Sequence, residues 1–426
     1  MESSIAESPS DSDRPYGRSF GERLRRHLDP LQRHLGPRIV LFVGCLLGMA
    51  SIGVFLVDRP HMVAINYFVY HVAAEAVLSG EGLYTVHPED RPAYRFLYPP
   101  IVVLAWIPFV LVDPWVGYTI QTLLSVAAGV GIGLLVARYV ESAGVRLGTI
   151  DRVLLCGFAV GSVHSVPTVI YGNVNLWLAL ALLAGVLALE RGRETAAGIL
   201  FALPALVKVF PAAIGLWLVR ARSPRAVVTA TVTGLGGLAA GAVVFGPATT
   251  VTWIEEALLP RREVDEFAGG LAPDAAYVTV RQPLSHVLPS EWLGFASVLI
   301  LAPILAYLYL DISEPIDRLV AVHGTIAAVV LFFPSYFVYL ALLYPTLLPL
   351  LYLLDAPAAR YPFLAGAFVA GFAVTGGDVQ EIAVLGPEPL ALVLGPVGSV
   401  VAVMTPPLLG VVLTLIGCVA YRYRQN

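Results

Sequence analysis

Residues 58–108 read DRPHMVAINYFVYHVAAEAVLSGEGLYTVHPEDRPAYRFLYPPIVVLAWIP, and they separate a first strongly apolar run from the rest of the chain. A connection of this length in a compact fold is usually either functional or disordered. Its five tyrosines and many apolar residues argue against disorder. We therefore expect a folded platform at the end of the first membrane helix, and we expect this platform to carry the active site.

The composition of the 426-residue chain is that of a membrane protein. Hydrophobic residues make up 58% of it, charged residues only 13%, and the mean hydropathy is +0.78. A soluble domain has about a quarter of its residues charged. Repeated apolar runs of roughly 17–25 residues between short polar loops predict transmembrane helices. The sequence predicts one all-α, multi-pass membrane domain with no soluble module and no internal repeat.

Hydrophobic runs place the predicted spans. They lie at about 38–57, 116–138, 152–170, 172–190, 224–245, 291–311, 317–334, 336–354, 361–376 and 399–421. Two stretches are ambiguous. The run 97–112 is short and rich in proline, and the run 195–219 is broken by Lys208 and Pro211.

The distribution of arginine decides between two topologies, because loops on the cytoplasmic side are enriched in positive charge. If 97–112 only dips into the outer face and 195–219 is a hairpin, 19 arginines lie inside and six outside. If both runs span the membrane, the numbers are 14 and 11. The first topology is favoured. It gives about twelve membrane helices, both termini in the cytoplasm, and Lys208 at the outer end of a hairpin.

The polar first 37 residues predict a disordered, basic cytoplasmic tail, with a short amphipathic segment over 20–35 as an alternative for part of it. The tail is too long and mixed for a signal peptide, so the first apolar run is expected to be a retained anchor. The remaining chain divides into a module at about 38–245, an outer loop at 246–290 and further helices at 291–421. Among these helices, the stretch 377–398 is acidic and rich in proline and glycine, and it is expected to be a second outer loop. The three cysteines fall within predicted helices, so no disulfide, metal site or redox chemistry is expected.

Lys208 is the single lysine of the chain and lies in an apolar run near a proline. An ionisable group inside a membrane is costly and marks a candidate functional site. A cation at this place would suit a phosphate or pyrophosphate group. The alternative is a lysine that reaches the outer headgroups, but that alternative does not explain the adjacent proline-broken helix.

Two further segments supply candidate anion-binding groups at the same face. Asn173 and Asn175 stand at a predicted helix start, where asparagine is an ordinary cap but free N–H groups also favour anions. Arg281 and His286 end the outer loop 246–290. Arg281 is either solvated or a second phosphate clamp. His164, one helical stretch earlier, is expected to make an interhelical hydrogen bond rather than to act in catalysis.

The first loop itself contains a predicted amphipathic helix at 67–79, lying on the membrane surface. Asn66 and Tyr70 would share one face, and His71 and Glu75 another, as a pair that is most often a simple surface contact. Tyr98 precedes two prolines, which fix an extended approach to a shallow helix at the interface, where tyrosine is favoured.

Five short motifs occur in order along the chain: residues 66–70 (NYFVY), 80–84 (GEGLY), 96–100 (FLYPP), 172–175 (GNVN) and 208–211 (KVFP). Together they resemble the GT-C superfamily of membrane glycosyltransferases. The closest resemblance is to glycosyltransferase family 87, the polyprenyl-phosphate-mannose-dependent α-1,2-mannosyltransferases and their relatives. The resemblance covers roughly residues 40–290.

The resemblance implies an inverting transfer, in which a hexose, with mannose expected, leaves a polyprenyl phosphate at the outer face of a prokaryotic cell membrane. A hydroxyl of a glycan or glycolipid acceptor would attack the anomeric carbon. Such a reaction needs a carboxylate as general base and cations that stabilise the departing phosphate. Lys208 and Arg281 suit the second role, while Tyr70, His71, Tyr98, Asn173, Asn175 and His286 are candidate substrate-binding residues.

The general base is where this chain departs from the family's pattern. The first-loop motif of the family begins with aspartate, and the best alignment places Asn66 there. An amide cannot accept the proton. Either Asp58 or Glu75 has taken the role of base, with Asp58 the first choice, or Asn66 orients the acceptor, or transfer activity has been lost.

Two other functions stay open at this stage. An inactive relative could bind a lipid-linked sugar without transferring it. A transporter or flippase would need polar groups along a path through the membrane, and the helices are nearly free of charge apart from Lys208. No glycine-rich nucleotide loop is found, so ATP or a nucleotide sugar is not expected as substrate. No cofactor, metal or nucleic-acid partner is expected, and membrane lipids surround the protein.

Overall fold

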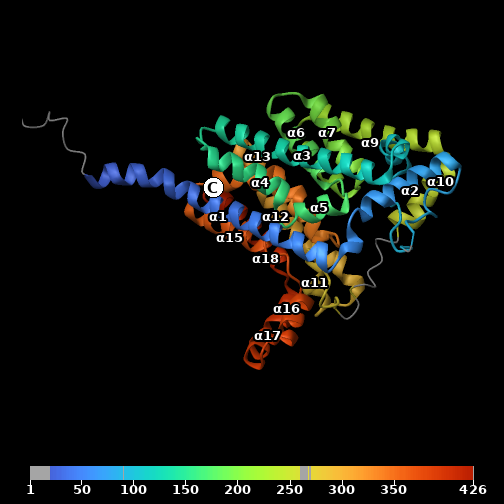
Figure 1. Ribbon diagram of the computed structural model, residues 1–426. Coiled ribbons are helices and arrows are strands. Elements are labelled where there is room, and N and C mark those ends of the chain that lie inside the picture. The colour runs from blue at the N-terminus through green and yellow to red at the C-terminus, as the bar shows by residue number, and fades with distance from the viewer. Residues whose placement is uncertain (1–19, 90, 260–266, 268–269, 426) are drawn as a thin grey trace, which may run out of the picture.

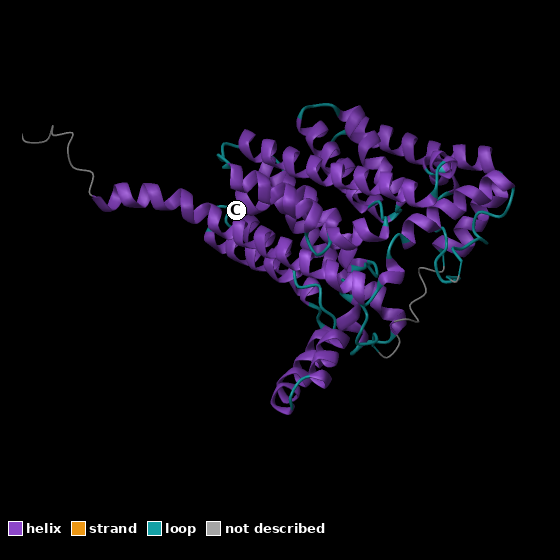
Figure 2. Ribbon diagram, viewed as in Figure 1, coloured by secondary structure: helices purple, strands orange, loops and turns teal. Residues whose placement is uncertain are grey.

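The computed structural model describes residues 20–89, 91–259, 267 and 270–425. These residues form helices and a single isolated bridge between Tyr277 and Tyr336 (Figures 1 and 2). The longer helices in the first half are α1 (Phe20–Val57), α2 (Ile65–Ser79), α3 (Pro114–Ser142), α4 (Thr149–Gly161), α5 (Ser165–Tyr171), α6 (Asn175–Glu190), α7 (Glu194–Val207), α8 (Ile214–Arg220) and α9 (Pro224–Phe245). Those in the second half are α10 (Pro247–Thr252), α11 (Arg281–Ser285), α12 (Leu293–Leu308), α13 (Pro315–Phe332), α14 (Tyr344–Leu353), α15 (Pro357–Ala370), α16 (Gly376–Leu385), α17 (Glu388–Val403) and α18 (Pro406–Tyr423). Short helical turns are η1 (Pro60–Met62), η2 (Pro100–Ala105), η3 (Ile107–Leu111), η4 (Phe210–Ala213), η5 (Trp253–Leu258), η8 (Ser290–Trp292) and η9 (Phe337–Leu343).

The prediction of an all-α polytopic membrane protein is confirmed. Within the described residues, seven helices are long and apolar enough to cross a membrane, or eight if the pair α4 and α5, bent by 46°, is one span. The predicted number of about twelve stays a prediction, because several of the expected spans are shorter apolar helices of 10–17 residues.

Ion pairs gather at one end of the bundle, which we call the paired end. Asp151 at the start of α4 accepts two hydrogen bonds of 2.9 Å from Arg38 of α1. Three other pairs there are Arg318–Glu190, Arg422–Asp317 and Arg152–Glu141. The other end, where α1 ends and α3 begins, is called the site end. Helices α1 and α4 run in the same direction between the two ends. They approach closely at Gly48 and Gly161, because a Cβ at Gly48 would collide with the carbonyl oxygen of Gly161.

Helices α7 and α8 form a hairpin that enters and leaves the bundle at the paired end. Glu194 of α7 accepts a hydrogen bond from the backbone N–H of Arg225 in α9, and Gly237 further along α9 lies against Leu206. Helix α7 therefore runs parallel to α9. Since α8 ends at Arg220, four residues before α9 begins, the chain must have returned to the paired end. The predicted hairpin over 195–219, with Lys208 at its tip, agrees with this arrangement.

The proline-rich run 97–112 stays at the site end, as expected. It folds into η2 and η3, and Ile101 packs against Gly241 in the last turns of α9. Helix α2 lies at the same end, where it contacts η2, η3, α5 and the start of α3. The stretch Pro60–Ser79 passes as a possible span by composition. However, α2 has only 15 residues, about 22 Å at 1.5 Å per residue, which is shorter than the hydrocarbon core.

Two expectations for the polar segments need correction. The predicted spans 361–376 and 399–421 correspond to α15 and α18, but the expected outer loop between them is a helical hairpin made of α16 and α17. Helix α1 begins at Phe20, so residues 20–37 of the predicted tail are helical, as in the alternative of an amphipathic segment over 20–35, and not disordered. Residues 1–19 of that tail lie outside the described residues.

Small residues let α15 and α18 pack closely in antiparallel fashion. A Cβ added at Gly366 of α15 would lie 2.5 Å from the carbonyl oxygen of Gly410 in α18, and one added at Gly410 would lie 2.6 Å from the oxygen of Gly366. Gly417 meets Ala359 and Phe363 in the same way about two turns further along α18. Close backbone approach through small residues is the usual means by which helices associate in a membrane.

Candidate active site

Lys208 lies at the tip of the α7–α8 hairpin, between α7 and η4, and its side chain is 4% exposed. The break in the helix follows from the sequence, because Pro204 and Pro211 flank the lysine and proline cannot continue a helical hydrogen-bond ladder. The ammonium donates a hydrogen bond of 2.6 Å to Asn175 Oδ1 and lies 3.9 Å from the centre of the Tyr339 ring. A desolvated cation over an aromatic ring gains about 2 kcal/mol.

Asn175 is held in place by the segment that precedes it. Gly172 turns the chain with a φ of +70°, and Asn173 Oδ1 accepts a hydrogen bond from the backbone N–H of Asn175 at 3.2 Å. Asn173 thus lies one residue before Val174, the N-cap of α6, and its side chain bonds the N–H of the first helical residue. The Asn175 amide then donates to the carbonyl oxygen of Val338 at 3.0 Å. Its oxygen is consequently turned toward Lys208.

Tyr339 comes from η9, a segment for which the motifs predict no function. Its ring packs against Phe210 of η4, with centres 5.7 Å apart, and so contacts the hairpin tip beside Lys208. The only signal in the sequence is a run of aromatic residues, 332–339 (FFPSYFVY), after an apolar helix. Such a run is ordinary at a membrane boundary, so periodicity and composition do not single out this tyrosine.

The first-loop platform supplies a second group of hydroxyls and rings. Tyr70 of α2 lies with its hydroxyl 3.1 Å from that of Tyr98, and the side chain of Asn66 also hydrogen-bonds to Tyr70. This contact confirms that Asn66 and Tyr70 share a helix face. The ring of Trp106, whose centre lies 4.3 Å from that of Tyr70, stacks on Trp177 of α6 with centres 6.5 Å apart, so the platform lies beside the start of α6 that carries Asn175. We call Asn66, Tyr70, Tyr98, Asn175, Lys208 and Tyr339 the site cluster.

Trp106 anchors this platform to the bundle. Its ring packs 4.3 Å from that of Tyr70, and its indole N–H donates to Gln121 of α3 at 2.8 Å. The Gln121 amide in turn donates to the carbonyl oxygen of Gly172. A Cβ at Gly172 would lie 2.7 Å from Cβ of Tyr67, so only glycine lets α2 approach this turn so closely. The platform and the turn are therefore positioned by each other.

The two carboxylates proposed as general bases, Asp58 and Glu75, lie outside the site cluster. Glu75 is exposed, and its carboxylate lies 3.2 Å from Nε2 of the buried His71. The predicted pair of His71 and Glu75 is thus confirmed. Asp58 follows the last residue of α1, and its side chain is exposed. The end of α1 packs on the turn, since the rings of Phe55 and Tyr171 are 5.4 Å apart.

Arg281 and His286 also lie at the site end but not within the site cluster. Arg281 is only 8% exposed, and its guanidinium carbon lies 4.7 Å from the centre of the Phe332 ring. Burial lowers the pKa of the guanidinium below its usual value. Its Nε is buried without a hydrogen-bond partner within the described structure. His286 is exposed and covers Gly270.

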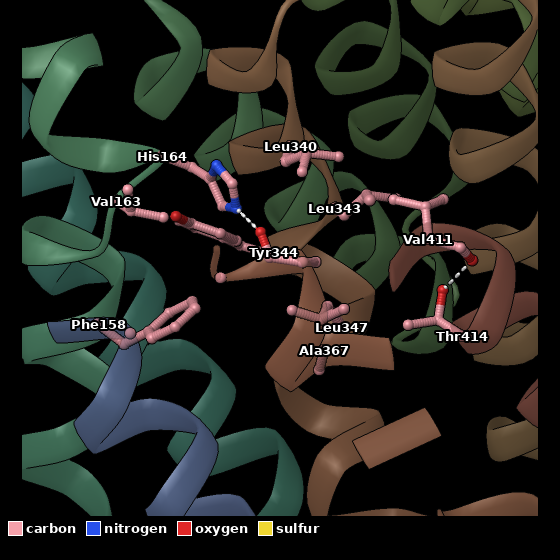
Figure 3. A pocket seen from close by; sticks show the side chains of 13 residues that line it. Phe158, Val163, His164, Leu340, Leu343, Tyr344, Leu347, Ala367, Val411 and Thr414 are labelled. Atoms are coloured by element: carbon pink, nitrogen blue, oxygen red, sulfur yellow. Dashed lines mark hydrogen bonds between the residues drawn. The ribbon is translucent and has the colours of Figure 1, made fainter. Parts of the chain in front are cut away.

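A cavity inside the bundle lies next to the site cluster without belonging to it. Figure 3 shows His164 and Tyr344 on its wall, together with Phe158, Leu340 and Leu347. His164 Nε2 donates to the carbonyl oxygen of Ala370 in α15 at 2.9 Å, which confirms the expected interhelical hydrogen bond. The Tyr344 hydroxyl lies 2.9 Å from that of Ser165. His164 Nδ1 is buried without a hydrogen-bond partner in the described part of the chain, and the remaining lining is mostly apolar, so we assign this cavity to the packing of the helices and not to the candidate site.

The site cluster has the groups needed to hold a sugar phosphate. Tyrosine hydroxyls and asparagine amides can hydrogen-bond to sugar hydroxyls, and aromatic rings offer an apolar face. A buried ammonium can bind a phosphate oxygen. Within the described residues, no three His, Cys, Asp or Glu side chains come together as metal ligands.

A helical membrane bundle with a buried cation, amides and tyrosines at one end defines a candidate polytopic membrane enzyme. The family model for glycosyltransferase family 87 matches residues 96–335, which is more than half of the chain. The chain belongs to glycosyltransferase family 87 and is thereby a membrane glycosyltransferase, which implies a sugar donor and an acceptor. No curated protein matches it, and no solved structure does.

The matched residues contain three of the five motifs, at 96–100, 172–175 and 208–211. The match extends to residue 335, beyond the last motif found in the sequence. It begins after the first-loop motifs at 66–70 and 80–84, so it does not test the position of Asn66.

Proposed function

We propose that this chain transfers a hexose, with mannose the first candidate, from a polyprenyl phosphate to a hydroxyl of a glycan or glycolipid on the outer face of a cell membrane. The observation that carries the proposal is the burial of Lys208 at the tip of the hairpin, against Asn175 and Tyr339. A buried ammonium beside sugar-binding hydroxyls fits a donor in which phosphate and sugar are adjacent.

In the proposed reaction the acceptor oxygen attacks the anomeric carbon while the bond from that carbon to the phosphate oxygen breaks. The acceptor proton passes to a carboxylate, for which Asp58 is the first candidate and Glu75 the second. Asp58 is favoured because the end of α1 packs on Tyr171, directly before the Gly172–Asn175 turn. Lys208 would stabilise the charge on the departing lipid phosphate, and Arg281 would be a second cation.

Asn66, Tyr70, Tyr98 and Asn175 would bind the sugar or the acceptor through their hydroxyl and amide groups, with His71, Asn173 and His286 as more distant candidates. In this proposal the site faces the outside and both termini lie in the cytoplasm, in accord with the arginine distribution. A prokaryotic cell membrane is the expected location.

A second candidate function is the binding of a lipid-linked sugar without transfer. It is favoured by one observation, that Asn66 hydrogen-bonds to Tyr70 in the site cluster and its amide cannot act as a base. The two candidate functions predict different transfer rates when the carboxylate at position 58 is removed or a carboxylate is introduced at position 66.

A transfer assay in proteoliposomes would separate them. It would present radiolabelled polyprenyl-phosphate mannose, and then the glucose analogue, to the wild type, Asp58→Asn, Asn66→Asp and Lys208→Ala. The matched control is Asp355→Asn, an exposed aspartate that follows α14 at the paired end. Transfer that is lost in Asp58→Asn but kept in Asp355→Asn supports the proposed base.

Two other results would change the assignment. Transfer by Asn66→Asp but not by the wild type would mean that the site is complete except for its base. Lysine-dependent binding of the labelled lipid without transfer by any variant would replace the enzyme with the binding protein.

A further inference from the structure

The hairpin of α16 and α17 leaves the bundle at the site end and projects to one side of it (Figures 1 and 2). Its base is fixed to the rest of the chain at three places. The backbone N–H of Gly377 donates to the carbonyl oxygen of Pro273 at 2.7 Å, and Arg59 lies 4.0 Å from Asp378. The Gln282 side chain donates to the carbonyl oxygen of Ala402 at the end of α17.

The outward face of α17 is almost entirely apolar. Of its exposed residues between positions 390 and 400, only Ser399 is polar, and the others are Leu390, Leu392, Val393, Pro396, Val397 and Val400. Leu392 is 79% exposed, and Leu385 at the end of α16 is 80% exposed. A contiguous apolar surface of this kind marks a site of contact with another protein or with a membrane.

The charges of the hairpin lie on α16 and at the tip. Asp378 and Glu381 belong to α16, and Glu388 is the first residue of α17. Residues 389–403 contain no charged side chain, and the whole hairpin contains no lysine or arginine. From Leu390 to Val400 the apolar face is therefore not interrupted by any charge.

The connection to α18 places this face beside the bilayer. Only Met404 and Thr405 separate α17 from α18, one of the helices able to span the membrane. Two residues of extended chain reach at most about 7 Å. The base of α17 therefore lies at the boundary where α18 enters the hydrocarbon, and its apolar face continues the lipid-exposed surface of the bundle.

We propose that the outward face of α17 is immersed in the bilayer leaflet at the site end, so that the hairpin anchors this end of the protein to lipid. The carboxylates of α16 and Glu388 at the start of α17 would then lie at headgroup level, as in other amphipathic elements that lie in a membrane interface. This inference does not rest on the proposed function. Because the base of the hairpin contacts Pro273 and Gln282, an anchored hairpin would also fix the position of α11 relative to the membrane.

Depth-dependent fluorescence quenching of the full chain tests the proposal. In a background with Cys45, Cys156 and Cys418 replaced by alanine, single cysteines at Leu392→Cys and, independently, Val400→Cys carry an environment-sensitive dye. Val232→Cys on α9 gives the lipid reference and Ala93→Cys in the first loop the water reference, since both positions are exposed. The samples are proteoliposomes with or without phospholipid that carries a nitroxide on its acyl chain.

The expected result is that nitroxide lipid quenches the dye at positions 392 and 400 as strongly as at position 232, while aqueous iodide quenches only position 93. Iodide quenching at 392 and 400 equal to that at 93 would place the face in water and overturn the proposal. Protection from both quenchers, with a bis-maleimide that joins two chains through position 392, would assign the face to a second copy and also overturn it. Thermal unfolding of each variant, compared with that of the cysteine-free parent, shows that the fold is retained.

Discussion

Lys208 is a buried cation between Asn175 and the ring of Tyr339. The contribution of its charge to donor binding can be measured separately from that of its side-chain length. Replacing it with methionine keeps the unbranched chain and removes the charge. A hydrogen bond that involves a charged group contributes about 1.5–3 kcal/mol, which corresponds to about a tenfold to hundredfold loss in kcat/KM for transfer. Kinetics with varied donor concentration measure this loss. An unchanged kcat/KM would exclude the ammonium from donor binding.

Tyr339 offers a matched pair of changes at the same place. Tyr339→Phe keeps the ring under the ammonium, whereas Tyr339→Leu removes it. If the cation–π contact positions Lys208, we expect Tyr339→Leu to lower the donor affinity by about tenfold and Tyr339→Phe to change it far less. Equal losses in both variants would instead assign the effect to the hydroxyl.

Asp151 stabilises the paired end through hydrogen bonds from three residues. It accepts from Arg38, from the backbone N–H of Gly148 and from the Tyr352 hydroxyl, and it is fully buried. We expect Asp151→Asn to reduce stability by about 3 kcal/mol, because it leaves the arginine without its counter-charge. Thermal unfolding in detergent at a fixed scan rate measures the change.

The control for Asp151 is Glu141, whose pair with Arg152 has a side-chain exposure of 30% and 53%. An exposed ion pair is worth at most about 1 kcal/mol, so Glu141→Gln should shift the unfolding midpoint little. If the two variants unfolded at the same temperature, burial would not be what distinguishes the two pairs.

At the level of elements, the contact of α15 with α18 depends on glycine. In Gly366→Ala the new Cβ would lie 2.5 Å from the Gly410 oxygen, which the backbone cannot avoid without separating the helices. Overpacking of this kind costs about 1–3 kcal/mol, so we expect a lower unfolding midpoint. Gly395→Ala in α17 is the control, since a Cβ there meets nothing within 4 Å and helix propensity favours alanine. A Gly366→Ala variant as stable as Gly395→Ala would contradict the close packing.

Much of the element pattern follows from the sequence alone. Apolar periodicity and the arginine distribution predicted the polytopic helical fold, and Lys208 with its flanking prolines predicted the hairpin tip. Of the motif residues, Asn175 contacts Lys208, while Tyr70 and Tyr98 contact each other in the first-loop platform; that they share one substrate site stays a prediction. Local motifs succeeded here because each one sits where a helix starts, ends or breaks.

The other features of the fold and of the site depend on contacts between segments that are far apart in the chain. Such contacts cannot be predicted from the pattern of a single sequence. Tyr339 joins the site cluster only because η9 packs on α6 and on the hairpin tip. The α16–α17 hairpin was expected to be a loop, because its prolines, glycines and carboxylates resemble loop composition. In the structure these residues cap and turn two short helices, and the apolar residues between them form the helical faces.

For the whole molecule, the arrangement of α7, α8 and α9 makes a prediction about sidedness. Single cysteines at Arg191→Cys and Arg225→Cys flank the hairpin, and both positions are exposed at the paired end. In the cysteine-free background, a membrane-impermeant maleimide added to intact cells should label neither, and it should label Ala93→Cys. After permeabilisation all three should react. Labelling of only one hairpin flank in intact cells would mean that the hairpin crosses the membrane.

The same hairpin has a consequence for the order in which the chain is assembled. Helix α7 has 14 residues and α8 has seven, and both are shorter than the roughly 20 apolar residues that the hydrocarbon layer requires of a helix. Neither α7 nor α8 can span the hydrocarbon layer by itself. Helix α7 packs along its length against α9, which is synthesised later. During biosynthesis, Lys208 can reach its final depth only after α9 has emerged from the ribosome and entered the bilayer.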